Sequence, residues 1–281
     1  MPIRLARNAY GKNAVNLSKI IRHKDYHEFR QISVNISLEG DFETVHTLGD
    51  NSKVLPTDTQ KNTVYALAKE YFGGSIEEFG IHLAEHFFSN NSQLSQCIVE
   101  IAEHLWNRIQ IKGQYHPHAY ISGGSEKHIT AIIKTHEKTA VTSGVKDLLI
   151  LKTSDSRFEN YIKDQYTTLN ETSDRVFATN CEVSWLYQIK PKDFTDIFNE
   201  IRTALISALA NDKSLSVQHT LYSMGEEVLN KFSAIKEIRL KMPNKHHIPF
   251  NLLQFGMENN NEIFIATDEP YGYISGTVTR E

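Results

Sequence analysis

The sequence has few cysteines and no long apolar run. Only Cys97 and Cys181 occur among 281 residues, in segments with the pattern of apolar strands, so we expect buried free thiols rather than a disulfide. No apolar stretch reaches the roughly 20 residues that span a membrane. Residues 1–7 lack the apolar segment of a secretory signal, and residues 279–281 are not a Ser-Lys-Leu peroxisomal address. We therefore expect a cytoplasmic protein with no membrane partner.

A strong charge of one sign is also missing. Lys and Arg total 30 against 34 Asp and Glu, which gives a formal net charge of -4. This balance argues against a nucleic-acid partner, and a small anionic ligand would need a local positive site. The sequence contains no strand-linked Gly-x-Gly-x-x-Gly, no Walker loop and no paired Cys-x-x-Cys, so no motif predicts a cofactor.

The chain is long enough, and at 40% hydrophobic residues apolar enough, to bury a large core. We predict two units, residues 1–140 and 141–281. The first unit reads as a strand hairpin, two helices and a second strand pair. Its clearest elements, from periodicity and capping residues, are strands at 27–38, 96–111 and 119–140, a helix at 57–72 and a second helix opened by Ser75.

The second half repeats this order. Predicted strands lie at 145–152, 174–189, 235–242 and 262–267, with helices at 192–211 and 217–232. Residues 62–70 resemble residues 219–227, both on predicted helices, which supports an internal duplication.

Strand pairs that flank two helices, repeated once, indicate an α+β fold with antiparallel sheets and helices on one face. Each half would leave exposed sheet edges, and joining subunits into a β-barrel would cover them. We therefore expect an oligomer.

One long pattern lies in the middle of the chain. It combines Lys152-Thr153-Ser154, Phe158, the run Tyr166-Thr167-Thr168-Leu169, and Asp174-Arg175. In this pattern the sequence resembles the urate oxidase (uricase) family, which has the tunnelling fold. Further matches in the same order lie at residues 10–12, 57–63, 216–218 and 243–246. The resemblance thus extends over nearly the whole chain.

The resemblance implies an enzyme of purine catabolism. It implies oxidation of urate by O2 and water to 5-hydroxyisourate and hydrogen peroxide, with urate and O2 as partners and without a cofactor or metal. It also implies a homotetramer with active sites at subunit interfaces.

The resemblance also assigns substrate-binding residues whose chemistry suits a flat purine anion. Phe158 would stack on the ring, and the Arg175 guanidinium would give it two parallel hydrogen bonds. Gln218 offers both an amide donor and an acceptor, and Val217 would contribute its backbone N–H at a helix start. The corresponding start of the first unit's helix, Thr57 and Asp58, would face the ligand across the interface.

The implied catalytic residues are Lys12, Thr57 and His246. The Thr57 hydroxyl would link the Lys12 amine to the substrate, and His246, which titrates near neutrality, would join the proton relay. Asn244 and Thr57 would hold O2 or the attacking water. We expect Asn244 and His246 to lie in a turn after a strand, where side chains can project over a ligand.

Three alternatives compete with this interpretation. His116, His118, His246 and His247 could in principle bind zinc or copper. Other tunnelling-fold enzymes handle pterins and would bind a purine-like ring without oxidising it. A protein that binds purines without catalysis is the third, although every expected polar position is retained.

Overall fold

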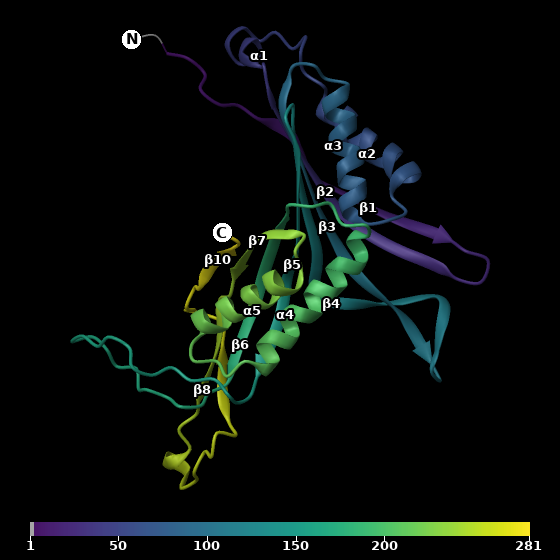
Figure 1. Cartoon of the computed structure of the whole chain (residues 1–281). Coiled ribbons are helices and arrows are strands. Elements are labelled where there is room, and N and C mark those ends of the chain that lie inside the picture. The colour runs from purple at the N-terminus through teal and green to yellow at the C-terminus, as the bar shows by residue number, and fades with distance from the viewer. Residues whose placement is uncertain (1–2) are drawn as a thin grey trace. The chain divides into compact units, whose positions relative to one another are not determined.

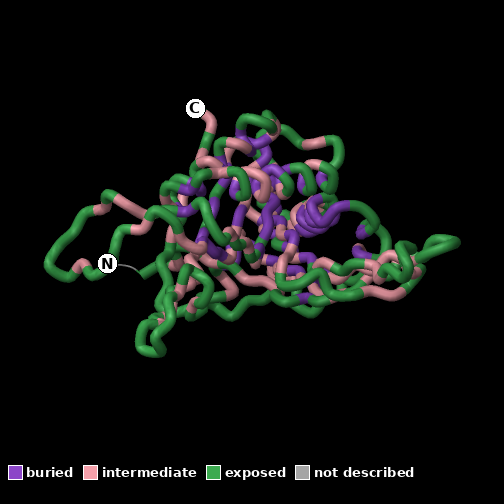
Figure 2. Tube along the Cα trace, turned by 90° about the horizontal axis from the view of Figure 1, so that it is seen from below, coloured by how far each residue is buried: buried purple, intermediate pink, exposed green. Residues whose placement is uncertain are grey.

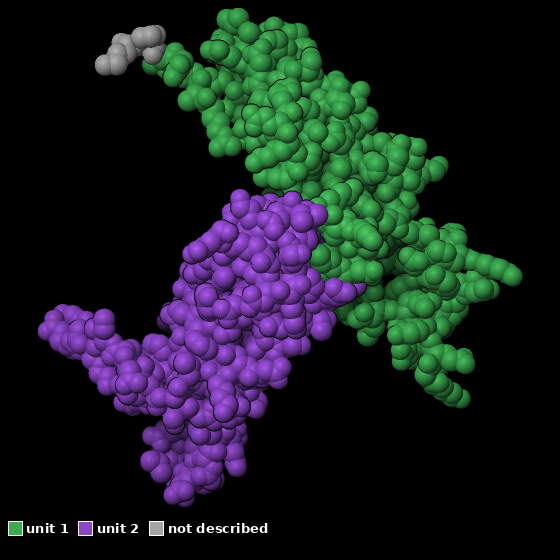
Figure 3. Space-filling view, in the orientation of Figure 1, with its two compact units in different colours: residues 1–144, 190–198 green, residues 145–189, 199–281 purple. Residues whose placement is uncertain are grey.

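The structure, a computed structural model, describes residues 3–281, so the first two residues of the N-terminal segment considered above lie outside the described residues (Figure 1). The chain divides into two compact units (Figure 3). Unit 1 comprises residues 1–144 and 190–198, and unit 2 comprises residues 145–189 and 199–281. The predicted repeat boundary at residue 140 stays a prediction, because a sequence repeat and a compact unit divide a chain on different grounds.

Unit 1 is an antiparallel sheet with helices on one face. Its strands are β1 (Tyr10–Arg22), β2 (His27–Gly40), β3 (Leu94–Ile111), β4 (Gln114–Thr135) and the first part of β5 (Thr139–Lys152), paired in that order. The helices are α1 (Glu43–Leu48), α2 (Thr57–Tyr71) and α3 (Ile76–Ser89). Helix α2 packs on β1 and α3 packs on β3 and β4 (Figure 1).

The two longer helices of unit 1 form where apolar periodicity and capping predict them. Helix α3 begins after Ser75, whose side chain accepts from the Glu78 N–H while the Glu78 carboxylate accepts from the Ser75 N–H. Helix α2 differs at its start, because its N-cap residue is Pro56 and no side chain caps it. Proline suits this place because its backbone is extended there (φ -53°, ψ 139°) and it has no N–H to leave unpaired.

Unit 2 combines the continuation of this antiparallel sheet with two long helices. The rest of β5 is followed in the sheet by β6 (Phe177–Tyr187), β7 (Ile235–Lys241) and β10 (Ser275–Thr279), while β8 (Asn244–Pro249) pairs with β6 and with β9 (Phe264–Thr267). The helices are α4 (Phe194–Asn211), which begins in unit 1, α5 (Val217–Lys231) and the short 3-10 helix η1 (Leu253–Phe255). Helix α5 packs on β7 and β10.

Some predicted boundaries are wrong. The strand expected at 119–140 ends at Thr135, because the Thr135 N–H donates to the Lys138 carbonyl (2.9 Å) and closes a tight turn before β5 starts. Of residues 243–247, expected as a turn, all but Pro243 lie in strand β8. Helix α1 and strand β10 have no counterpart in the predicted elements.

Burial follows the alternation of the strands and the apolar faces of the helices (Figure 2). Along β2, Ile32, Val34, Ile36 and Leu38 are all buried, since residues two apart share one face of a strand. Cys97 and Cys181 are buried free thiols, as predicted. Among the described residues, no helix is long and apolar enough to span a membrane.

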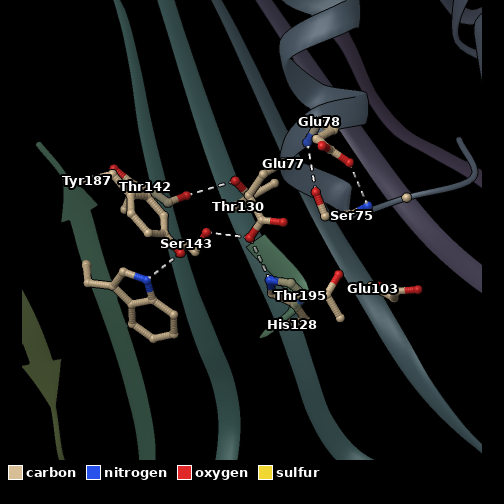
Figure 4. Close-up of polar contacts among 12 residues, drawn as sticks. Ser75, Glu77, Glu78, Glu103, His128, Thr130, Thr142, Ser143, Tyr187 and Thr195 are labelled. Carbon is tan, nitrogen blue, oxygen red and sulfur yellow. Dashed lines mark hydrogen bonds and ion pairs between the residues drawn. The ribbon is translucent and has the colours of Figure 1, made fainter. Parts of the chain in front are cut away.

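A buried polar cluster interrupts the apolar interior of unit 1 (Figure 4). The Glu77 carboxylate is fully buried on α3, and one of its oxygens, Oε1, lies 2.8 Å from His128 Nε2. The Ser143 hydroxyl donates to the same oxygen. The His128 ring also stacks on Phe198, with ring centroids 3.6 Å apart.

The sheet edges remain open within each unit. Among the described residues, β1 pairs with β2 alone and β10 pairs with β7 alone. Neither unit therefore closes into a barrel by itself, and the edges are free to pair with other strands.

Candidate active site

Unit 2 contains a cavity of about 630 Å³, within the roughly 300–1,000 Å³ typical of small-molecule sites. Arg175, Asn244 and His246, three of the predicted site residues, line it together. Threonines from the preceding loop and Lys245 add polar groups to the wall. Side chains that are far apart in sequence are thus gathered at one concave surface.

Arg175 lies just before β6, and its guanidinium lies over an aromatic ring. Its Cζ lies 5.4 Å from the centroid of the Phe158 ring, close enough for a cation–π contact. Burial lowers the pKa of Arg175, because a low-dielectric environment disfavours the charged form. Within residues 3–281 its buried Nε has no hydrogen-bond partner. A partly buried cation with an unused donor is suited to an anionic ligand.

Phe158 is held by both its backbone and its ring. Its N–H donates to the Thr172 carbonyl (2.9 Å), and it accepts from the Thr172 N–H (3.1 Å). Tyr161 stacks on the Phe158 ring, with centroids 4.8 Å apart and planes 12° from parallel. Phe158 does not line the cavity itself but adjoins it through Arg175.

Asn244 and His246 lie on β8, not in the turn that the sequence predicted. The strand forms because Asn244 and Lys245 pair with Thr179 and Ala178 of β6, and β9 covers the other side. Two residues apart on a strand, Asn244 and His246 share one face. Asn244 Oδ1 is buried and, among the described residues, has no hydrogen-bond partner. It remains available to a ligand or water.

Val217 and Gln218 are the first two residues of α5. The N-cap Ser216 side chain accepts from the His219 N–H (3.1 Å), and the Ser216 carbonyl accepts from the Thr220 N–H. The first N–H groups of a helix have no intrahelical acceptor, so those of Val217 and Gln218 can bind an anion. Neither residue lines the cavity, and Gln218 is exposed.

In unit 1, Lys12 lies on β1 and pairs with Ile36 of β2. Gly11 is required there, because a Cβ at this position would lie 1.8 Å from the Ile36 carbonyl oxygen. The register of β1 against β2 shifts between Lys12 and Val15, where Ala14 has a positive φ of 55°. The bulge sets the direction of the chain beside Lys12.

Thr57 and Asp58 are the first two residues of α2, and both are exposed. Asp58 accepts hydrogen bonds from Lys61 and from Asn62 Nδ2 (3.0 Å). The pKa of Asp58 is lowered mainly by Lys61, with smaller contributions from Asn62 and the positive charge of Lys12. Lys12 is therefore near enough to Asp58 to act on it electrostatically, which the sequence alone did not show.

Sequence reasoning missed residues that support the site. Tyr161 backs the Phe158 ring, and the Asp174 carboxylate accepts from Ser154 Oγ (2.7 Å) and the Ser156 N–H (3.4 Å). These hydrogen bonds lower the pKa of Asp174, Ser154 most of all. Tyr161 and Asp174 lie inside the central pattern, which was the available signal. Among the described residues, no group of three His, Cys, Asp or Glu side chains is placed to hold a metal ion.

Comparisons with known proteins place the chain in a family. A family model described as Uricase matches residues 8–133 and 141–275. A protein named Uricase from Arthrobacter globiformis is 39% identical over 99% of this chain and 90% of its own length. Proteins of the same name from Dictyostelium discoideum and Oryctolagus cuniculus are each 35% identical, over 98% and 99% of this chain and 97% and 95% of their own lengths.

Solved structures show the same fold. The crystal structure of uricase from Arthrobacter globiformis superposes with a TM-score of 0.95 at 38% identity and covers 100% of this chain and 96% of its own. A urate oxidase structure from Bacillus sp. TB-90, at 22% identity and a TM-score of 0.84, covers 97% of this chain and 100% of its own. By sequence and by fold, the chain belongs to the uricase family.

Proposed function

We propose that this chain is a urate oxidase that converts urate, O2 and water to 5-hydroxyisourate and hydrogen peroxide without a cofactor. The observation that carries the proposal is the cavity in which Arg175 Nε and Asn244 Oδ1 are buried without partners among the described residues. Unsatisfied buried polar groups are costly unless a ligand or water pairs with them. A purine anion offers acceptors to the first group, and a bound water can donate to the second.

Urate binding would use the positive charge of Arg175 and the flat ring of Phe158. Urate would accept two parallel hydrogen bonds from Arg175 and stack on the Phe158 ring. The Val217 N–H and the Gln218 amide would pair with the purine edge. Fixing the anion in this way supplies orientation before the reaction starts.

The chemistry would be a two-electron transfer from urate to O2. Loss of a proton from bound urate makes the ring a stronger reductant, and we assign that proton to a relay of Lys12, Thr57 and His246. O2 takes up two electrons and two protons as hydrogen peroxide, and a water adds its oxygen at the oxidised purine carbon. Asn244 and Thr57 would hold O2 and then that water.

The test measures urate absorbance loss and peroxide formation together, using chelator-treated protein. We expect equal amounts of urate lost and peroxide formed. Lys12→Ala should slow turnover strongly, whereas Lys24→Ala, an exposed lysine in the β1–β2 turn, should not. Arg175→Lys keeps the positive charge but loses the two parallel hydrogen bonds of the guanidinium, so the KM for urate should rise roughly tenfold to hundredfold. Turnover that returns only on addition of a metal would contradict the cofactor-free proposal.

We further propose a homotetramer with sites at subunit interfaces, located in the cytoplasm. The open edges at β1 and β10 support an assembly through strand pairing. Light scattering should give four times the 32.1 kDa chain mass. Mixing an Arg175→Lys chain with a Lys12→Ala chain should restore activity if each site takes residues from two subunits. Cell fractionation tests the location.

A further inference from the structure

A buried hydroxyl cluster lies behind the substrate-binding end of unit 2. The Thr220 hydroxyl, on the fourth residue of α5, lies 2.8 Å from Asp212 Oδ2 and 2.7 Å from Ser214 Oγ. A hydroxyl can donate one hydrogen bond and accept others, so Thr220 can donate to the carboxylate and accept from Ser214. Thr220 is fully buried and Ser214 is 1% exposed. None of the residues assigned to binding or proton transfer belongs to this cluster.

The cluster is joined to the Phe158 loop by backbone hydrogen bonds. Ser214 donates its N–H to the Asp155 carbonyl (3.0 Å) and accepts from the Arg157 N–H (2.9 Å). This is a parallel bridge between Ser156 and Ser214, both of which are almost completely buried.

The other edge of the same loop segment is joined to Arg175. The Ser156 carbonyl accepts from the Arg175 N–H (2.8 Å), and Phe158 exchanges two hydrogen bonds with Thr172. Along residues 155–158 the backbone therefore bonds alternately to Ser214 on one side and to residues 172–175 on the other. Ser214 is the point at which the Phe158 and Arg175 backbone connects to the start of α5.

We infer that Thr220 is a positioning residue for urate binding: through Ser214 it sets the Val217 and Gln218 end of α5 against Phe158 and Arg175. The inference rests on the proposed function of that site. Capping of α5 alone does not need Thr220, because the Ser216 side chain already accepts from the His219 N–H. The Thr220 hydroxyl lies 3.2 Å from the Ser216 carbonyl of its own helix start, but its two shorter contacts, to Asp212 and Ser214, reach outside the helix to the chain that leads from α4 to α5. Lys152 Nζ fixes the same chain by donating to the Asp212 carbonyl.

The test compares Thr220→Val with Thr220→Ser. Valine keeps the volume and the β-branch of threonine but removes the hydroxyl, whereas serine retains it. The matched control is Thr203→Val on α4, whose hydroxyl donates only within its own helix, to the Asn199 carbonyl (2.8 Å). Urate affinity is measured without O2, so that binding is separated from turnover.

We expect Thr220→Val to weaken anaerobic urate binding about fivefold to tenfold, which corresponds to one lost hydrogen bond and a shifted site. Thr220→Ser retains the hydroxyl and its hydrogen bonds, so its urate affinity should be within about twofold of the unsubstituted protein. Thr203→Val should have no effect. Amide hydrogen exchange at Arg157 and Ser214 should accelerate in Thr220→Val. If the variant only destabilised the helix, exchange would accelerate along α5 instead.

The outcomes separate two failures. If Arg175→Lys weakens urate binding and Thr220→Val leaves both binding and exchange unchanged, the positioning role is refuted while the site stands. If Arg175→Lys also has no effect, the proposed urate site itself is wrong. Should Thr220→Val fail to fold, Ser214→Ala gives the same comparison, because it removes the partner hydroxyl while the backbone bridge can persist.

Discussion

The buried pair Glu77 and His128 allows a quantitative test of how unit 1 is stabilised. Glu77 has no exposed surface and His128 has 6%, so neither polar group can turn to water if its partner is lost. Leucine at position 128 removes the donor 2.8 Å from Glu77 Oε1 and the ring stacked on Phe198. Leaving a buried carboxyl group without that donor costs about 1–3 kcal/mol or more, and the lost aromatic stacking adds about 1 kcal/mol.

His128→Leu should therefore lower the free energy of unfolding by about 2–4 kcal/mol. For a chain of this size each kcal/mol corresponds to roughly 2–4 °C in Tm, so the expected loss is about 10 °C. Glu77→Leu should be comparably harmful, because it strands the His128 ring nitrogen and the Ser143 hydroxyl. The double variant should lose much less than the sum, since two apolar groups leave fewer buried polar atoms unpaired.

The assay is urea unfolding followed by circular dichroism at one fixed protein concentration, because assembly makes apparent stability depend on concentration. His86→Leu, at an exposed position of α3, is the control and should change stability little. The double-mutant cycle should give a coupling free energy of about 2 kcal/mol or more. Losses that add to within about 0.5 kcal/mol would refute the reasoning, because independent sites behave in that way.

Three further predictions concern chemistry and backbone. Burial raises the pKa of Cys97 and of Cys181 to about 12, so both thiols stay protonated below that pH and should not react with a disulfide reagent at pH 8 until the chain unfolds. Gly11→Ala should reduce both stability and turnover, since the new methyl group would lie 1.8 Å from the Ile36 carbonyl oxygen and push β1 away from β2. Exposed Met257 should become a sulfoxide during turnover, as peroxide is produced, detected by peptide mass spectrometry.

Each of these has a control within the chain. Gly73→Ala meets no atom within 4 Å and should change little, so equal damage from both glycine variants would argue against the steric explanation. Met224 and Met242 are fully buried and should stay unoxidised, and catalase should protect Met257. In urea both cysteines should react; fast reaction of the folded protein would show that the thiols are accessible.

Much of the fold could be predicted because its signals are local. Ser75 and Glu78 form the capping box that their spacing indicates, and the helix expected at 57–72 agrees with α2 to one residue. Strand β8 could not be predicted in this way. Pro243 and the polar residues after it have the composition of a turn, but residues from Asn244 onward form a strand because β6 and β9 supply hydrogen-bond partners from elsewhere in the chain.

The candidate site was likewise predicted only in part from the sequence. The identities of Arg175 and Asn244 came from a sequence pattern, but their shared cavity and unpaired atoms depend on tertiary structure. Thr220 and Ser214 carried no recognisable motif, because serine and threonine near a helix start usually serve as caps. Their connection to Phe158 depends on a bridge between segments more than fifty residues apart.

The two-sided bonding of residues 155–158 restricts how this loop can change in length. Because successive backbone groups bond to opposite neighbours, one inserted residue there would exchange the partners of Ser156 and Arg157 and turn Phe158 away from Arg175. Residues 159–171 connect the two hydrogen-bonded segments 155–158 and 172–175, and this alternation of backbone partners does not restrict their length. Natural or engineered insertions in this part of the protein should therefore accumulate in 159–171, and the five-residue approach from Ser154 to Phe158 should keep a fixed length.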